Sequence, residues 1–227
     1  MRPIIIAPSL LAADFTQLGN EIEKVTLAGG DWLHIDIMDG HFVPNLAIGM
    51  PTIASIRKRF PNHYLDCHLM VEHPTRWVDK LINIGVNGIT FHLETVSENM
   101  CKDLIDKINS HHIKAGVAIC PDTSVSTIKS TINNIQDQLD MILVMTVKPG
   151  FGGQKFIMKT LPKIKELRKI YPDINIQVDG GLNIETTKLA AKNGANVIVA
   201  GSYIFKSKNM EHTITSLKAS VCFFSSI

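Results

Sequence analysis

Two segments of the chain place an aspartate inside an apolar, β-branched run that is typical of a buried parallel strand. They are WLHIDIMDG (32–40), which contains Asp36, and INIQVDGGL (174–182), which contains Asp179. An unpaired carboxylate is costly to bury, so buried carboxylates are usually paired with a cation or bound to a metal. Both aspartates are therefore candidates for chemistry.

Two histidines accompany these aspartates on strand-like segments. His34 alternates with Asp36 and therefore points to the same face of its strand, and HYLDCHLMV (63–71) repeats the pattern with His68. Two imidazole nitrogens and two carboxylates suit a divalent first-row metal such as zinc, iron, manganese or cobalt, whereas magnesium and calcium prefer oxygen ligands. The alternative is an Asp/His cluster that is hydrogen-bonded without a metal.

A metal with two flanking carboxylates indicates a particular reaction. When a metal chelates a carbonyl and its neighbouring hydroxyl, it stabilises the enediolate that forms on deprotonation of the carbon that bears the hydroxyl. Carboxylates from two strands, Asp36 and Asp179, can reach that carbon from opposite faces. One would remove the proton and the other would return a proton from the far side, which inverts the carbon without hydrolysis or redox chemistry.

The order of the elements predicts a (β/α)₈ TIM barrel, an eight-stranded parallel barrel surrounded by helices, that forms one domain over residues 1–227. Its 25.1 kDa suits an undivided α/β domain. Helix-period segments separate the strands, and we found no linker between them, which favours a closed barrel over a doubly wound open sheet. The eight strand-like runs begin near Ile4, Leu33, Tyr64, Gly88, Ala115, Met141, Asn175 and Asn196.

Several residues mark expected helix starts. A capping box at Asp14 would start a helix with Phe15, Leu18, Ile22 and Val25 on its apolar face. The other start signals are Pro74, Ser97, Pro162 and Asn183.

A barrel of this class carries its functional residues at the carboxyl ends of the strands. Three glycine-containing segments follow the last three strands: KPGFGGQ (148–154), DGGLN (179–183) and AGSYIF (200–205). Each alone is consistent with a tight turn, but together they lie where such barrels bind phosphate through backbone N–H groups. Ser202 adds a hydroxyl donor, so we expect a small phosphate ester as the ligand. The polar or small residues near strand ends are Ser9, His34, Asp36, His68, Asp179, Gly201 and Ser202.

Three methionines also have inward-compatible positions near strand ends: Met38, Met70 and Met145. Core filling and an apolar wall that excludes water from the enediolate are equally consistent with them. For His92 we favour a structural role over a place in the site. The loop with His41, Phe42 and Asn45 is long enough to cover the mouth of the barrel.

Composition excludes several classes of protein. The net charge of +2 indicates neither a nucleic-acid partner nor a basic membrane face, and no apolar stretch is long enough to span a bilayer. The N-terminal segment lacks a signal or transit pattern. The cysteines lack metal-type spacing, so we expect four buried thiols in the cytoplasm. They are Cys67, Cys101, Cys120 and Cys222.

At the level of whole segments, the chain resembles the ribulose-phosphate 3-epimerase family. The resemblance covers essentially the whole chain in the right order, and it implies a metal-dependent isomerase that interconverts ribulose 5-phosphate and xylulose 5-phosphate in the pentose phosphate pathway, usually as a homo-oligomer. The matching segments are APSLLAADF (7–15), HIDIMDGHFVPN (34–45), DCHLMVEHP (66–74), MTVKPGFGGQKF (145–156) and VDGGLN (178–183).

The resemblance also implies roles for individual residues. Asp36 and Asp179 would be the proton acceptor and donor, and with His34 and His68 they would bind one divalent metal. The methionine wall would be Met38, Met70 and Met145. The one departure noted is Lys148, where relatives carry Asn or Glu. The implied substrate contacts are Ser9, His68, Gly150, Phe151, Gly152, Gly153, Asp179, Gly180, Gly181, Gly201 and Ser202.

Three other functions fit the sequence less well. A Schiff-base aldolase would need a lysine on an inward strand position, but Lys114 is at the wrong end of its strand. A metal-dependent phosphosugar decarboxylase would need a lysine beside its aspartates, and none fits. A non-catalytic sugar-phosphate-binding or structural-zinc barrel would not require the Asp36–Asp179 pair.

Overall fold

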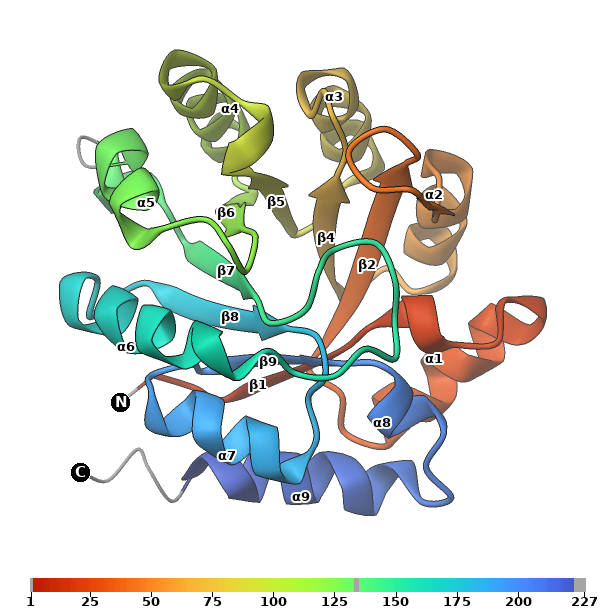
Figure 1. The fold of residues 1–227 in the computed structure, drawn as a ribbon. Coiled ribbons are helices and arrows are strands. Elements are labelled where there is room, and N and C mark those ends of the chain that lie inside the picture. Colours follow the sequence, from red (N-terminus) through yellow and green to blue (C-terminus); the bar gives the residue numbers. More distant parts are fainter. Residues whose placement is uncertain (1, 133–134, 223–227) are drawn as a thin grey trace.

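The computed structural model describes residues 2–132 and 135–222, which form a parallel β-barrel surrounded by helices (Figure 1). This confirms the predicted (β/α)₈ fold, and each of the eight parallel strands begins within one residue of its predicted start. The strands are β1 (Ile5–Pro8), β2 (Trp32–Asp39), β3 (Leu46–Ala47), β4 (Tyr64–Met70), β5 (Gly88–His92), β6 (Lys114–Ile119), β7 (Met141–Met145), β8 (Asn175–Asp179) and β9 (Val197–Ala200).

Helices follow the strands along the chain and cover the outside of the barrel (Figure 1). They are α1 (Leu18–Leu27), α2 (Met50–Arg59), α3 (Thr75–Ile84), α4 (Glu98–Ser110), α5 (Val125–Ile132), α6 (Leu161–Ile170), α7 (Ile184–Lys192), α8 (Ser202–Phe205) and α9 (Met210–Cys222). No helix in the described ranges is both long and apolar enough to cross a membrane.

The sheet runs in the order β1-β9-β8-β7-β6-β5-β4-β2-β3 and closes between β1 and β2. Closure depends on an isolated parallel bridge between Ser9 and His34. Below it, the Asp31 N–H donates to the Ile6 carbonyl at 2.9 Å, and the Ile6 N–H donates to the Asp31 carboxylate at 2.8 Å. The closure therefore brings Ser9 directly beside the β2 residues of the predicted site.

One strand was not predicted. The two residues of β3 pair antiparallel with the end of β2, in the register Met38–Ala47 and Asp39–Leu46. A two-residue strand is too short to show alternation in the sequence, so only the pairing reveals it.

The prediction that Phe15 belongs to the apolar face of the first helix was wrong. The Asp14 carboxylate accepts the Thr16 N–H at 2.9 Å and caps a 3-10 turn, so α1 begins only at Leu18 and Phe15 is 52% exposed. The remaining core residues of this face, Ile22 and Val25, are fully buried as predicted.

The later helix signals agree with the structure. Ser97 caps α4, Asn183 forms a capping box with Thr186 at the start of α7, Pro162 lies in the first turn of α6, and Pro74 directly precedes α3.

The cysteines whose side chains are described are free thiols. Cys67 and Cys101 are buried as predicted, but Cys120 is only half-buried because it follows β6 at the mouth of the barrel. The side chain of Cys222 lies outside the described part of the chain.

Candidate active site at the carboxyl end of the barrel

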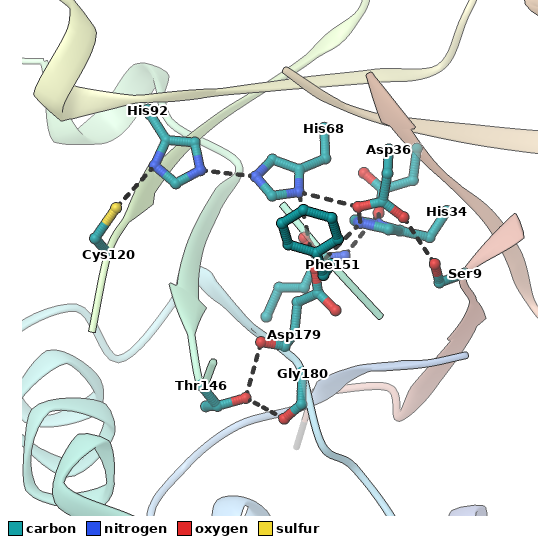
Figure 2. A network of polar contacts seen from close by, with 12 residues as sticks. Ser9, His34, Asp36, His68, His92, Cys120, Thr146, Phe151, Asp179 and Gly180 are labelled. Carbon is teal, nitrogen blue, oxygen red and sulfur yellow. Dashed lines mark hydrogen bonds and ion pairs between the residues drawn. The ribbon is translucent and has the colours of Figure 1, made fainter. Parts of the chain in front are cut away.

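The four predicted metal ligands lie together at the carboxyl end of the barrel (Figure 2). His34 and Asp36 come from β2, His68 from β4 and Asp179 from the last position of β8. His34 Nε2 is 3.5 Å from Asp36 Oδ1 and 3.7 Å from Asp179 Oδ2. His68 Nδ1 is 3.5 Å and 3.8 Å from the same two oxygens. Strand register therefore brings residues far apart in the sequence to one point.

These separations suit ligands of a common ion better than hydrogen-bonded partners. They exceed the usual hydrogen-bond length, and both His34 Nε2 and His68 Nδ1 are buried with no hydrogen-bond partner. Donor atoms bound to one tetrahedral ion at about 2.0–2.2 Å lie roughly 3.3–3.6 Å apart. The residues present therefore fit a divalent cation, and the nitrogen and oxygen donors suit a first-row metal.

Asp66 orients one of these histidines, although sequence analysis did not identify it. Its carboxylate, fully buried on β4, accepts His34 Nδ1–H at 2.8 Å and Gln177 Nε2–H at 2.6 Å. The bond leaves His34 Nε2 as the atom that faces the two aspartates. The available signal was the spacing, since Asp66 lies two residues before His68 and shares its face of the strand.

The second histidine is bonded to His92 on β5. The Nε2 atoms of His68 and His92 are 3.0 Å apart, and His92 Nδ1 is 3.0 Å from Glu94 Oε2. His92 is thus part of the network of the site rather than an isolated structural residue, and Glu94 was also missed from the sequence.

The two aspartates have pKa values displaced in opposite directions. Burial by itself would raise the pKa of Asp36, but the charge of His34 and the contacts with His34 and His68 hold it below its ordinary value. Burial, together with the negative charge of Asp36, raises the pKa of Asp179 to about 7. Such a divergence is typical of an acid–base pair.

The pKa values of His34 and His68 are also shifted in opposite directions. Burial opposes charge on His34, but Asp36 and Asp66 raise its pKa well above the ordinary value. Burial lowers the pKa of His68 to about 4, and the neighbouring His92 and His34 contribute to this shift. The surroundings of His34 therefore favour a positive charge, which a bound cation would also supply.

A cavity of about 360 Å³ opens above this cluster. Asp36 and Asp179 line it, whereas His34 and His68 are fully buried and are absent from its lining. Except for His68, every predicted substrate-contact residue lines the cavity. These are Ser9, Gly150, Phe151, Gly152, Gly153, Asp179, Gly180, Gly181, Gly201 and Ser202.

The three methionines also line this cavity while being buried. Met38 and Met70 pack with Val43, and Met145 packs with Val147 in a separate cluster. They therefore combine core packing with an apolar lining around the carboxylates.

The loop between β7 and α6 extends across the barrel toward β2 (Figure 1). Asn45 Nδ2, from the predicted covering loop, donates to the Gly150 carbonyl at 2.8 Å, and Gln154 Nε2 donates to the carbonyls of Lys148 at 2.7 Å and Phe151 at 2.8 Å. In the view of Figure 2 the half-exposed Phe151 ring lies in front of the cluster. These two loops together cover part of the cavity.

Glycine is required at Gly180 and Gly181 beside the cavity, because both have a positive φ and a Cβ on either would clash. Gly181 has φ +69°, and a Cβ there would lie 2.4 Å from the Phe156 nitrogen. At Gly152 a Cβ would meet no atom within 4 Å. A Cβ at Gly153 would lie 4.0 Å from Ser202 Oγ, so the loops after β7 and β9 meet at this end of the cavity.

The fold and the site define a barrel enzyme with a metal-type His/Asp cluster beneath a ligand cavity. The model of the ribulose-phosphate 3-epimerase family matches residues 5–205. The chain belongs to this family, as its segments suggested, and is therefore an isomerase that acts as a carbohydrate epimerase. The family acts on a sugar phosphate.

Curated relatives agree with this assignment. The cytoplasmic isoform of ribulose-phosphate 3-epimerase from Oryza sativa subsp. japonica is 47% identical over 95% of this chain and 93% of its own length. Ribulose-phosphate 3-epimerase from Bacillus subtilis (strain 168) is 42% identical over 96% of this chain and 99% of its own.

Solved structures share the fold at low sequence identity. The 3-keto-L-gulonate-6-phosphate decarboxylase from Vibrio cholerae has a TM-score of 0.75 at 16% identity and covers 99% of each chain. The 3-hexulose-6-phosphate synthase from Salmonella typhimurium has a TM-score of 0.72 at 15% identity, and the match covers 99% of this chain and 100% of that one. These likenesses show the barrel architecture only.

Proposed function

We propose that this protein interconverts D-ribulose 5-phosphate and D-xylulose 5-phosphate by proton transfer at C3, with one divalent metal ion and with Asp36 and Asp179 as the two proton-transfer groups. The observation that carries the proposal is the convergence of these two carboxylates, from β2 and β8, on one cavity floor. Their opposite pKa shifts support the assignment, because one group can be ionised while the other carries a proton.

The carboxylates each direct one oxygen at the histidines, and the second oxygen of Asp36 has a partner of its own. Asp36 Oδ1 and Asp179 Oδ2 face the histidines. Asp36 Oδ2 accepts the Ser9 hydroxyl at 2.7 Å, which orients the carboxylate. The carboxylate that is ionised removes the C3 proton, and the other donates a proton to the opposite face, so the configuration at C3 is inverted.

His34, Asp36, His68 and Asp179 would hold the metal. When bound, zinc, iron, manganese or cobalt would act as a Lewis acid that stabilises negative charge on the substrate oxygens of the enediolate. Asp66 supports this role, because its bond to His34 Nδ1 keeps His34 Nε2 directed at the aspartates.

The substrate's phosphate would bind between the loops after β7, β8 and β9. Gly153 and Ser202 approach one another there, and Gly181 gives the backbone a conformation that other residues rarely adopt. Met38, Met70 and Met145 would limit water beside the enediolate.

We also place the protein in the cytoplasm, in the pentose phosphate pathway, as a homo-oligomer.

Solvent isotope exchange tests this function. Purified protein in D₂O should introduce deuterium at C3 of ribulose 5-phosphate and produce xylulose 5-phosphate, whereas a barrel that only binds sugar phosphates would give no exchange. Prior removal of metal with a chelator should abolish exchange, and added zinc, iron, manganese or cobalt should restore it. Full exchange by verified metal-free protein would refute the metal requirement and leave epimerisation intact.

A further inference from the structure

We propose that Glu94, acting through His92, fixes which nitrogen of His68 carries hydrogen, so that His68 Nδ1 is presented to the metal as a bare ligand atom. Glu94 and His92 are then positioning residues. The inference depends on the metal site of the proposed function.

The geometry is a chain of side chains that leads away from the site, and Figure 2 shows its first two members, His68 and His92. Cys120 Sγ also lies 3.7 Å from His92 Nδ1. His68 Nε2 and His92 Nε2 are 3.0 Å apart, and His92 Nδ1 is 3.0 Å from Glu94 Oε2. Both rings are fully buried and stack with centroids 5.1 Å apart. The Phe42 ring packs against the His92 ring, with their centroids 4.7 Å apart. The rings are therefore held where a single hydrogen must lie between the two Nε2 atoms.

Glu94 is an acceptor at both of its oxygens. Its Oε1 atom accepts the Cys120 N–H at 2.7 Å and the Thr123 hydroxyl, which leaves Oε2 to His92. Although burial opposes the charge, these bonds and the contact with His92 lower the pKa of Glu94 to about 2. Because a carboxylate cannot donate, His92 Nδ1 must carry the hydrogen of this bond.

The hydrogen on His92 Nδ1 determines where the hydrogens on the other ring nitrogens lie. With one hydrogen between the two Nε2 atoms and the His92 hydrogen on Nδ1, His92 accepts at Nε2 and His68 donates from its own Nε2. His68 Nδ1 is then bare, and it is the buried atom that has no hydrogen-bond partner and faces Asp36 and Asp179. The reverse order would place a hydrogen on His68 Nδ1 and block it as a ligand.

The substitution Glu94→Gln tests this order. The Cys120 and Thr123 donors should hold the amide oxygen in the place of Oε1, so the amide NH₂ would face His92 Nδ1. His92 would then carry its hydrogen on Nε2 and His68 on Nδ1. Nitrogen-15 NMR of metal-free protein should show His68 with hydrogen on Nε2 in the wild type and on Nδ1 in the variant. Competition with a chromophoric chelator should show zinc affinity reduced by about 10–100-fold.

Two further variants serve as controls. Thr123→Val removes a donor to Glu94 without changing the hydrogen order, so His68 and zinc affinity should match the wild type. His92→Gln offers an amide oxygen that can accept the His68 Nε2–H, whereas His92→Leu cannot, so Gln should retain more zinc affinity than Leu.

The outcomes separate this inference from the proposed function. A wild-type His68 with hydrogen on Nδ1, or a folded Glu94→Gln protein with wild-type NMR signals and zinc affinity, overturns the role of Glu94 whatever the turnover. Failure of the wild type to exchange deuterium, with the predicted NMR signals and zinc affinities intact, overturns the function but not the role of Glu94.

Discussion

The regions that carry β4 (residues 57–87) and β8 (residues 168–196) share one structure at the amino end of the strand and differ at the carboxyl end. In each, an arginine from the preceding helix donates through Nη1 to three carbonyls of the turn before the strand. Arg57 bonds to Phe60, Pro61 and His63, and Arg168 bonds to Tyr171, Pro172 and Ile174.

We call each set of arginine bonds, together with the asparagine that joins it, a clamp. Asn87 Oδ1 accepts the Leu65 N–H at 2.9 Å and a bond from Arg57 Nη2. In the β8 region, Asn196 Oδ1 accepts the Ile176 N–H at 2.9 Å and Arg168 Nη2 at 3.0 Å. These bonds tie each strand to the helix before it and to the start of the next strand.

The carboxyl ends of the two strands are different. The β4 strand places His68 in the site and continues to Met70, whereas β8 ends at Asp179 and is followed by Gly180 and Gly181, both with positive φ. The asparagine oxygens at the amino ends are hydrogen-bonded in both regions. The comparison teaches that one hydrogen-bonded frame at the amino end of a strand can support different functional groups at its carboxyl end.

The largest effect is expected from the carboxylates. Because each would serve one face of the substrate carbon, Asp179→Asn or Asp36→Asn should reduce kcat by at least ~10²–10⁴-fold. Circular dichroism and thermal unfolding should show a folded barrel in both. Near-normal turnover by either purified variant would exclude the two-aspartate scheme.

Replacement of either histidine should reduce turnover in a way that added metal partly reverses. His68→Ala or His34→Ala should lower bound metal, measured by elemental analysis, and should lower turnover with it, because each removes one proposed ligand. Added metal should partly restore turnover in these variants but not in Asp179→Asn. Wild-type activity without bound metal would contradict the proposed ligand set.

A glycine after β8 should give a smaller effect on binding. Gly181→Ala should raise KM for ribulose 5-phosphate and destabilise the fold by about 1–3 kcal/mol, because Cβ would clash with Phe156 at a positive φ. Gly85→Ala is the matched control, because Gly85 also has a positive φ but follows α3 outside the cavity lining, so this variant should lose stability and keep the wild-type KM. Equal KM values in both variants would remove Gly181 from phosphate binding.

The smallest effect on chemistry is expected from the clamps. Asn87→Ala and Asn196→Ala should each lower the free energy of unfolding by about 1–3 kcal/mol, because a strand N–H loses its partner. Urea titration measures this loss, and metal affinity should stay at the wild-type level. A fall in metal affinity in Asn87→Ala would show that the clamp also controls His68.

The sequence by itself determined the strands and the residues that carry the proposed chemistry. Alternation with period two is a local property, so it placed His34 and Asp36 on one face and located eight strand starts to within one residue. An aspartate in an apolar run is equally visible without a structure, and so is a glycine pair after a strand.

Only the tertiary structure decided which groups meet. The bonds of Asp66 to His34 and Gln177, of His92 to His68, and of Asn45 to the loop after β7 join residues far apart in the chain. Such contacts depend on strand register and barrel closure, which no local pattern specifies. The same reason explains β3 and the exposed Phe15, because pairing and burial depend on neighbours that the sequence does not place.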